Sequence, residues 1–213
     1  MKFQKNKLAI IATSAAWLLM IGVGIGLLWN YESTPGLAAA APEQWPAESH
    51  IQRAADRATL IMLAHPHCPC TRASISELSR LMTQAQGHVK AYVLFVKPAN
   101  FSDGWEQTDL LASAAAIPGV VVVRDTEGVE AGRFHAATSG QTMLYDTEGK
   151  LLFSGGITSA RGHEGDNAGR TAIVSLLTTN EAEQKETPVF GCPLFAQTEC
   201  PMGKESVHEK NNH

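Results

Sequence analysis

A long apolar stretch lies near the N-terminus of the chain. Residues 8–29 carry no charged side chain, and they match the roughly 20 residues that a helix needs to cross a bilayer. Three of the seven preceding residues are lysines, and such residues favour the cytoplasmic side. We therefore expect a cytoplasmic tail at residues 1–7, a single-pass transmembrane anchor at residues 8–29 and a periplasmic or other extracytoplasmic folded part.

A cleavable signal peptide is the alternative to an anchor, because the alanines at residues 38–41 could supply a small-residue cleavage site. Its apolar core would, however, exceed the usual length of about 7–15 residues. We therefore favour an uncleaved anchor. In either case the folded part faces an oxidising compartment, where cysteines form or exchange disulfides.

The size and charge of the chain limit the kinds of protein that it can be. Its 213 residues, 44% of them hydrophobic, suit one globular domain with an appendage. The formal net charge of -4 and the sequence pI near 6.1 provide no basic surface for a phosphate backbone. We therefore expect no nucleic-acid partner.

After the apolar stretch, a segment rich in Ala and Pro at residues 30–50 is predicted to be a linker. Residues 51–180 form the predicted domain, and residues 181–213 a polar, Cys-containing C-terminal tail. Strand-like apolar runs alternate with helical periodicity in the domain and end in a hairpin, which predicts an α/β fold: a mixed sheet flanked by helices on both faces. The predicted strands are residues 59–64, 89–96, 120–123, 142–145 and 150–153, and the predicted helices are a segment around residues 75–82 and residues 105–116, 127–135 and 167–178.

The stretch HPHCPC at residues 65–70 contains two cysteines and two histidines, which are candidates for redox or metal chemistry. If Pro69 is the first helical residue, Cys68 is the helix cap and Cys70 lies in the first turn. The positive end of the helix dipole would then stabilise a thiolate. A competing helix start exists, since Ser74 and Glu77 fit a capping box, and it would leave the cysteines in the preceding loop.

The Cys-x-Cys spacing favours thiol exchange over a structural staple. A Cys68–Cys70 bridge must hold its Cα atoms about 4.4–6.8 Å apart and keep a near-right-angle torsion, so it should be strained. Strained disulfides are the more labile ones. His65 and His67 could transfer protons, lower a thiolate pKa or bind a soft metal, or they could simply satisfy hydrogen bonds at a strand end.

The order of elements and the motifs resemble the thioredoxin-like superfamily over about residues 58–178. A strand leads into a Pro-containing cysteine pair, and the chain later reads TMLYDTEGKLLFSGG in the hairpin. The arrangement resembles the alkyl-hydroperoxide-reductase and cytochrome-maturation branch. More narrowly, HPHCPCTRASISEL, GHEGDN at residues 162–167 and VFGCPLF at residues 189–195 look like the RedB family of membrane-anchored thioredoxin-like proteins.

This resemblance implies a thioredoxin-like fold and a thiol-disulfide oxidoreductase that requires no cofactor and exchanges disulfides with a protein partner. A thiolate attacks, a mixed disulfide forms, and a second cysteine resolves it. Cys68 is the candidate attacker and Cys70 the candidate resolver. One departure is that Gly140, Gln141 and Thr142 stand where thioredoxins place a cis-proline, which strengthens a metal-binding interpretation.

Two further cysteines, Cys192 and Cys200, each precede a proline in the tail. Bridged to each other, they would close a short loop and staple the tail. Alternatively, the tail folds back and exchanges disulfides with Cys68 and Cys70, or adds thiolates to a metal site. Four cysteines allow three pairings, and the sequence does not choose among them.

Two alternatives to an oxidoreductase follow from the same residues. A Cu(I)-binding metallochaperone or redox sensor would use the thiolates of Cys68 and Cys70 with the imidazoles of His65 and His67, since both donor types suit that ion. A tethered interaction domain would use its cysteines only structurally.

Overall fold

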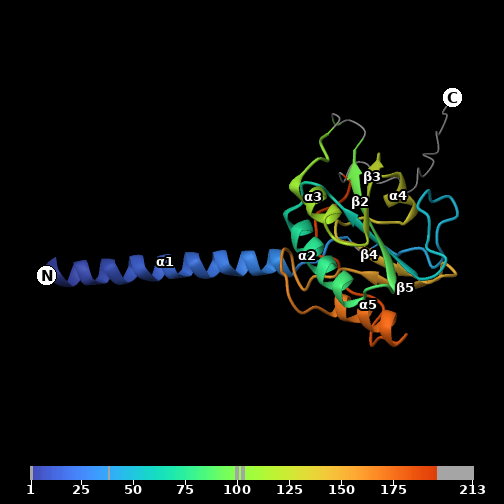
Figure 1. The fold of residues 1–213 in the computed structure, drawn as a ribbon. Helices are drawn as coiled ribbons and strands as arrows, with labels where there is room; N and C mark the ends of the chain where they lie inside the picture. Colours follow the sequence, from blue (N-terminus) through green and yellow to red (C-terminus); the bar gives the residue numbers. More distant parts are fainter. Residues whose placement is uncertain (1, 38, 99–100, 102–103, 196–213) are drawn as a thin grey trace, which may run out of the picture.

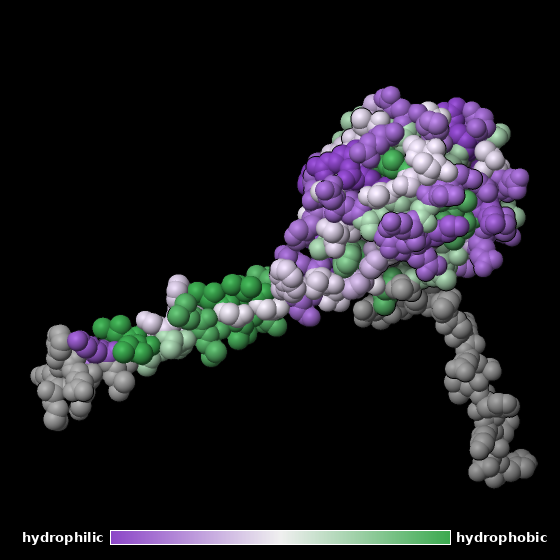
Figure 2. All heavy atoms as spheres, turned by 90° about the horizontal axis from the view of Figure 1, so that it is seen from below, coloured by the Kyte–Doolittle hydropathy of each residue, from purple (hydrophilic) through white to green (hydrophobic). Residues whose placement is uncertain are grey.

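The computed structural model describes residues 2–37, 39–98, 101 and 104–195, and consists of a long N-terminal helix followed by an α/β domain (Figure 1). The helix, α1 (Lys2–Ser33), continues four residues beyond the predicted anchor. Its part Ala9–Ser33 has a mean hydropathy of 2.1, is not buried, and is long and apolar enough to cross a membrane. Figure 2 shows this apolar rod beside a domain of mixed surface polarity. Membrane anchors and signal sequences share these properties.

One five-stranded mixed sheet organises the domain. Its spatial order is β3-β2-β1-β4-β5. The first three strands in sequence are parallel, and β4 runs antiparallel to both β1 and β5. The strands are β1 (Ala58–Ala64), β2 (Val89–Lys97), β3 (Val120–Thr126), β4 (Thr142–Tyr145) and β5 (Leu151–Gly155).

Helices cover both faces of this sheet. The domain helices are α2 (Pro69–Gln84), α3 (Asp109–Ala115), α4 (Val129–Arg133) and α5 (Ala168–Thr178). In β1, Leu60 and Met62 pack into the core formed with α2, α3 and α5. Ile61 and Leu63 point into the opposite core, which includes Phe134 just after α4. Burial on both faces explains why β1 reads as a continuous apolar run, and the architecture confirms the predicted thioredoxin-like fold class.

The element boundaries differ most where local turns compete with helix. The helix predicted at residues 105–116 begins only at Asp109, because Gln107 N–H donates to the carbonyl of Gly104 in a tight turn. The helix predicted at residues 127–135 shortens to five residues. The hairpin strand at residues 142–145 has the predicted bounds.

The segment predicted as a linker lies against the domain along part of its length. The Trp45 ring packs edge-on against Phe134 and Tyr145, with centroid distances of 5.1 and 5.2 Å. The backbone N–H of Trp45 donates to the Gly149 carbonyl at 2.7 Å, and the backbone N–H of Leu151 donates to the Glu43 carbonyl at 2.9 Å. These contacts attach the segment to the β4–β5 hairpin.

Candidate redox site

The cysteine pair lies where β1 ends and α2 begins. Cys68 is the N-cap of α2 in an extended conformation, and Pro69 occupies the first turn. Cys70 follows in that turn, and Ser74 and Glu77 are buried inside the helix. Of the two helix starts that the sequence allows, the structure therefore has the one that brings both cysteines to the positive end of the helix dipole.

Both cysteines are buried: Cys68 is 1% exposed and Cys70 is 6% exposed. Thr71 and Ser139 join this helix start to the loop before β4, with their hydroxyl oxygens 2.8 Å apart. The Ser139 hydroxyl also accepts the His65 N–H at 2.9 Å. A protein partner therefore cannot reach the Cys68 sulfur without movement of the segments that cover it.

The C-terminal tail supplies a third cysteine to the site. The Cys192 Sγ lies 2.9 Å from the Cys68 Sγ. Cys68, Cys70 and Cys192 are free thiols. Cys200 lies outside the described residues, so its predicted bridge to Cys192 stays a prediction.

Backbone pairing holds Cys192 in this place. The Ser139 N–H donates to the Cys192 carbonyl at 2.8 Å, and the Leu194 N–H donates to the Ala137 carbonyl at 2.9 Å. Thr138 and Pro193 form an isolated antiparallel bridge between them. The tail thus pairs like a short strand with the loop that precedes β4.

The close approach of the tail requires glycine at position 191. A Cβ atom built there would lie 1.9 Å from the Ser139 carbonyl oxygen. Any larger residue would push the tail away from the loop, and with it the neighbouring Cys192.

The surroundings of Cys68 favour its thiolate. Burial acts to raise the pKa of Cys68, but hydrogen bonds outweigh this effect and hold the pKa below its usual value. The donors are the thiol and N–H of Cys192, then the Thr71 hydroxyl and the Cys70 N–H. Because the thiolate is the nucleophile, Cys68 is the most activated of the three described thiols.

The other two cysteines are held as thiols. Burial, followed by the charge of the Cys68 thiolate, raises the pKa of Cys70. Burial and the Cys68 hydrogen bond and charge raise the pKa of Cys192 to about 12. The guanidinium of Arg161 opposes both shifts. Of the three described cysteines, Cys68 therefore forms its thiolate at the lowest pH.

Arg161 also connects the site to the end of α1. Its side chain donates to the carbonyl of Gly191, beside Cys192, and to the carbonyl of Thr34. Its backbone N–H donates to the backbone carbonyl of Glu32 at 3.1 Å, and its guanidinium lies 5.0 Å from the Tyr31 ring centroid. Neither Arg161 nor its role was predicted, since no motif connects residue 161 with residue 68.

The two predicted histidines gather around an aromatic side chain. The rings of His65 and His67 lie 5.4 and 4.5 Å from the Trp105 ring by centroid. The His65 Nδ1 accepts the His67 N–H at 3.2 Å, and burial, followed by the charge of His67, lowers the pKa of His65. His65 is therefore suited to act as a neutral hydrogen-bond acceptor.

No group of three or more His, Cys, Asp or Glu side chains that could hold a metal ion occurs in the part of the chain that the structure describes. The Cu(I) site with Cys68, Cys70, His65 and His67 therefore stays a prediction. All peptide bonds within the described ranges are trans. In the loop that replaces the cis-proline, the Gly140 N–H donates to Leu63 at 2.7 Å.

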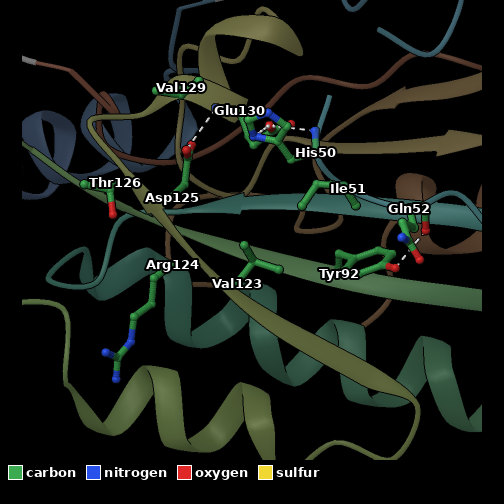
Figure 3. Close-up of a pocket in the computed structure, with 10 residues that line it drawn as sticks. All are labelled: His50, Ile51, Gln52, Tyr92, Val123, Arg124, Asp125, Thr126, Val129 and Glu130. Atoms are coloured by element: carbon green, nitrogen blue, oxygen red, sulfur yellow. Dashed lines mark hydrogen bonds and ion pairs between the residues drawn. The ribbon is translucent and has the colours of Figure 1, made fainter. Parts of the chain in front are cut away.

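A pocket of about 560 Å³ lies apart from the cysteines, between β2, β3 and α4 (Figure 3). Its carboxylates already have partners within the protein. Asp125 accepts the N–H groups of Glu130 and Ala131, and Glu130 accepts the Ser49 hydroxyl and the His50 N–H. These side chains fasten α4 and the N-terminal segment to β3, and we assign them a structural role.

The thiol of Cys192 is expected to help set the pH at which Cys68 forms its thiolate. Replacing Cys192 with alanine removes the donor thiol, so the pKa of Cys68 should rise, and the thiolate should form only at higher pH. Replacing Cys192 with serine keeps a hydroxyl donor and should move the pKa less. The ultraviolet absorbance of the thiolate, measured against pH and corrected with a Cys68→Ser variant, reports the midpoint. Equal midpoints in the alanine and wild-type proteins would contradict the assigned hydrogen bond.

Comparison with known proteins supports the fold. No family model and no curated protein matches the chain. It is similar to the crystal structure of an uncharacterized conserved protein from Geobacillus kaustophilus, with 19% identity and a TM-score of 0.58 over 78% of this chain and 100% of that one. A hypothetical protein from Sinorhizobium meliloti 1021 matches at 19% identity and a TM-score of 0.54, over 76% and 93% of the two chains.

A third solved structure is the exposed lipoprotein thioredoxin Etrx1 from Streptococcus pneumoniae, with 15% identity and a TM-score of 0.42 over 66% of this chain and 99% of that one. At such identities the first two similarities concern the fold alone. The order β3-β2-β1-β4-β5 of the mixed sheet, with a buried cysteine pair at the start of α2, is what the predicted thioredoxin-like fold requires.

Proposed function

We propose that this protein is a membrane-anchored, extracytoplasmic thiol-disulfide oxidoreductase in which Cys68 is the attacking thiolate. The observation that carries the proposal is the position of Cys68 at the N-cap of α2, where its pKa is lowered while the pKa of Cys70 is raised. A thiolate at a helix start next to thiol donors is the environment of exchange-active cysteines. A structural cysteine would need no such activation.

The membrane part of the proposal rests on the lysines before the apolar stretch and on the length of α1. We propose that α1 remains as a single-pass anchor, with the N-terminus in the cytoplasm and the domain outside it. On the motifs HPHCPCTRASISEL, GHEGDN and VFGCPLF we further propose kinship with the RedB family.

The test is catalysis of disulfide reduction by the full-length protein in detergent micelles. A quenched fluorescent peptide that contains a disulfide serves as substrate, and dithiothreitol supplies electrons. Replacing Cys68 with serine should reduce the rate to that of the buffer, because a hydroxyl cannot form the mixed disulfide. Cys200→Ser serves as the control for loss of a cysteine and should keep the activity. Equal rates for the wild-type and Cys68→Ser proteins would refute the proposal.

A further inference from the structure

We infer that Cys192, rather than Cys70, is the resolving cysteine for Cys68. The inference rests on the proposed oxidoreductase function and names the residue that completes its chemistry. In the resulting oxidised state, a Cys68–Cys192 disulfide would connect the tail to the start of α2.

The geometry favours Cys192 over Cys70 as the partner. The Cys192 and Cys68 sulfurs are 2.9 Å apart, at least as close as the roughly 3–3.5 Å from which a nucleophile attacks. The alternative bridge to Cys70 must close the short Cys-x-Cys ring, in which disulfide geometry is strained. Cys192 comes from a separate segment, so its bridge carries no such restriction from sequence spacing.

The tail is held for this task by more than one contact. The Cys192 carbonyl accepts the Ser139 N–H, and the following Leu194 donates its N–H to the Ala137 carbonyl. Arg161 contacts the preceding Gly191 carbonyl, and the Gly36 N–H donates to the Val189 carbonyl at 2.8 Å. The sulfur of Cys192 is thus presented to Cys68 by a braced segment, although the two residues are 124 positions apart.

The charges at the site would make Cys192 more nucleophilic once Cys68 has formed a mixed disulfide. Burial is the main cause of the raised pKa of Cys192, and the Cys68 thiolate adds to it through a hydrogen bond and through its charge. A mixed disulfide at Cys68 removes that charge, whereas Arg161 still favours the Cys192 thiolate. The nucleophilicity of Cys192 therefore increases after Cys68 has reacted, and not before.

The chemistry balances as follows. The Cys68 thiolate attacks one sulfur of a partner's protein disulfide, which forms a mixed disulfide and releases the other partner sulfur as a thiolate. Cys192 loses its proton to that released thiolate and attacks the Cys68 sulfur. The Cys68–Cys192 bond forms as the bond from Cys68 to the partner breaks. The second partner sulfur leaves as a thiolate and takes a proton from water, so the partner gains two electrons and becomes a dithiol, while this protein becomes oxidised by two electrons.

The position of the tail also defines how a partner enters. The tail covers Cys68 and pairs with residues 137–139, so a partner must first displace it. When the tail returns, Cys192 resolves the mixed disulfide and expels the partner in the same movement. Cys192 is also less buried than Cys68, so its sulfur is the more accessible end of the resulting disulfide.

The experiment traps the mixed disulfide with glutathione. Full-length protein in detergent micelles, in a Cys200→Ser background, is reduced, exposed to oxidised glutathione and quenched with acid. Intact mass and peptide mapping then report adducts in four proteins: the background itself, Cys70→Ser, Cys192→Ser and the double variant. Circular dichroism verifies that each is folded.

We expect the Cys192→Ser protein to retain glutathione on Cys68, because nothing resolves the adduct. The background and Cys70→Ser proteins should instead lose glutathione and contain a Cys68–Cys192 linkage. Retention in Cys70→Ser, or its absence in Cys192→Ser, would overturn the assignment. The double variant distinguishes an error in the choice of resolving cysteine from an error in the proposed function. If even that protein takes no glutathione on Cys68, the proposed oxidoreductase function itself is wrong.

Discussion

Replacing Glu77 with alanine is expected to lower the free energy of unfolding by about 3–5 kcal/mol, the usual effect of breaking a buried ion pair by removing one partner. Glu77 lies inside α2 with a fully buried side chain. Its Oε1 accepts the Gly165 N–H at 2.8 Å, and its Oε2 lies 3.1 Å from Arg170 Nε and accepts the Asn167 side chain at 3.0 Å. The variant leaves the mostly buried Arg170 side chain with only the exposed Asp166 carboxylate as an ion-pair partner.

The measurement is urea unfolding of the full-length protein in detergent, followed by circular dichroism. A matched control is Glu164→Gln, since Glu164 pairs with Arg80 at 3.0 Å on the surface and exposed pairs contribute about 0–1 kcal/mol. A change in the Glu77→Ala protein no larger than in this control would contradict the structural role of Glu77. The buried carboxylate of Glu77 gives the GHEGDN motif a structural role, because Gly165 and Asn167 of this motif donate hydrogen bonds to it.

Replacing Gly191 with alanine is the second change with a large expected effect. The added Cβ would lie 1.9 Å from the Ser139 carbonyl oxygen, which is backbone and cannot rotate away. Overpacking of this kind costs about 1–3 kcal/mol, so the tail should open. Because about 1.4 kcal/mol is tenfold in an equilibrium, alkylation of Cys68 by a maleimide should accelerate about tenfold or more. Peptide mapping by mass spectrometry measures that rate.

Gly132→Ala is the control for this experiment, because a Cβ atom at Gly132 meets nothing within 4 Å. Alkylation of Cys68 should be unchanged in that protein. The Gly191→Ala protein should also form less of the Cys68–Cys192 disulfide, although both cysteines remain. If its Cys68 stayed as protected as in the wild type, the tail would not be what covers the site.

Most of the fold could be predicted from local patterns in the sequence. Apolar runs predicted β1, β2 and β3, and the turn between two short segments predicted the hairpin of β4 and β5; in β1 the run is continuous because the strand is buried on both faces. The cap at Cys68 followed from Pro69, whose missing N–H costs nothing at the start of a helix. The predicted helix at residues 105–116 was too long, because a turn at Gly104 delays the helix to Asp109.

The site was less predictable, because long-range contacts complete it. Cys68, Cys70 and Cys192 were all predicted as candidates, but the sequence left their pairing open. Only the fold brings Cys192 to within 2.9 Å of Cys68. Ser139 and Arg161 lie in loops, and hydrophobic periodicity does not predict how such loops pack around the site. A signal was present in FGCP, where a glycine beside a cysteine allowed a close backbone approach.

The contacts between Arg161 and the end of α1 have a geometric consequence. The Arg161 backbone and guanidinium hold Glu32 and Tyr31, while its side chain touches Gly191 beside the reactive sulfurs. If α1 crosses a membrane as proposed, no long linker separates the reactive thiols from the bilayer surface. They work at one fixed height just above the lipid headgroups, so a disulfide must be delivered to that height, by a membrane protein or by one that settles on the bilayer surface.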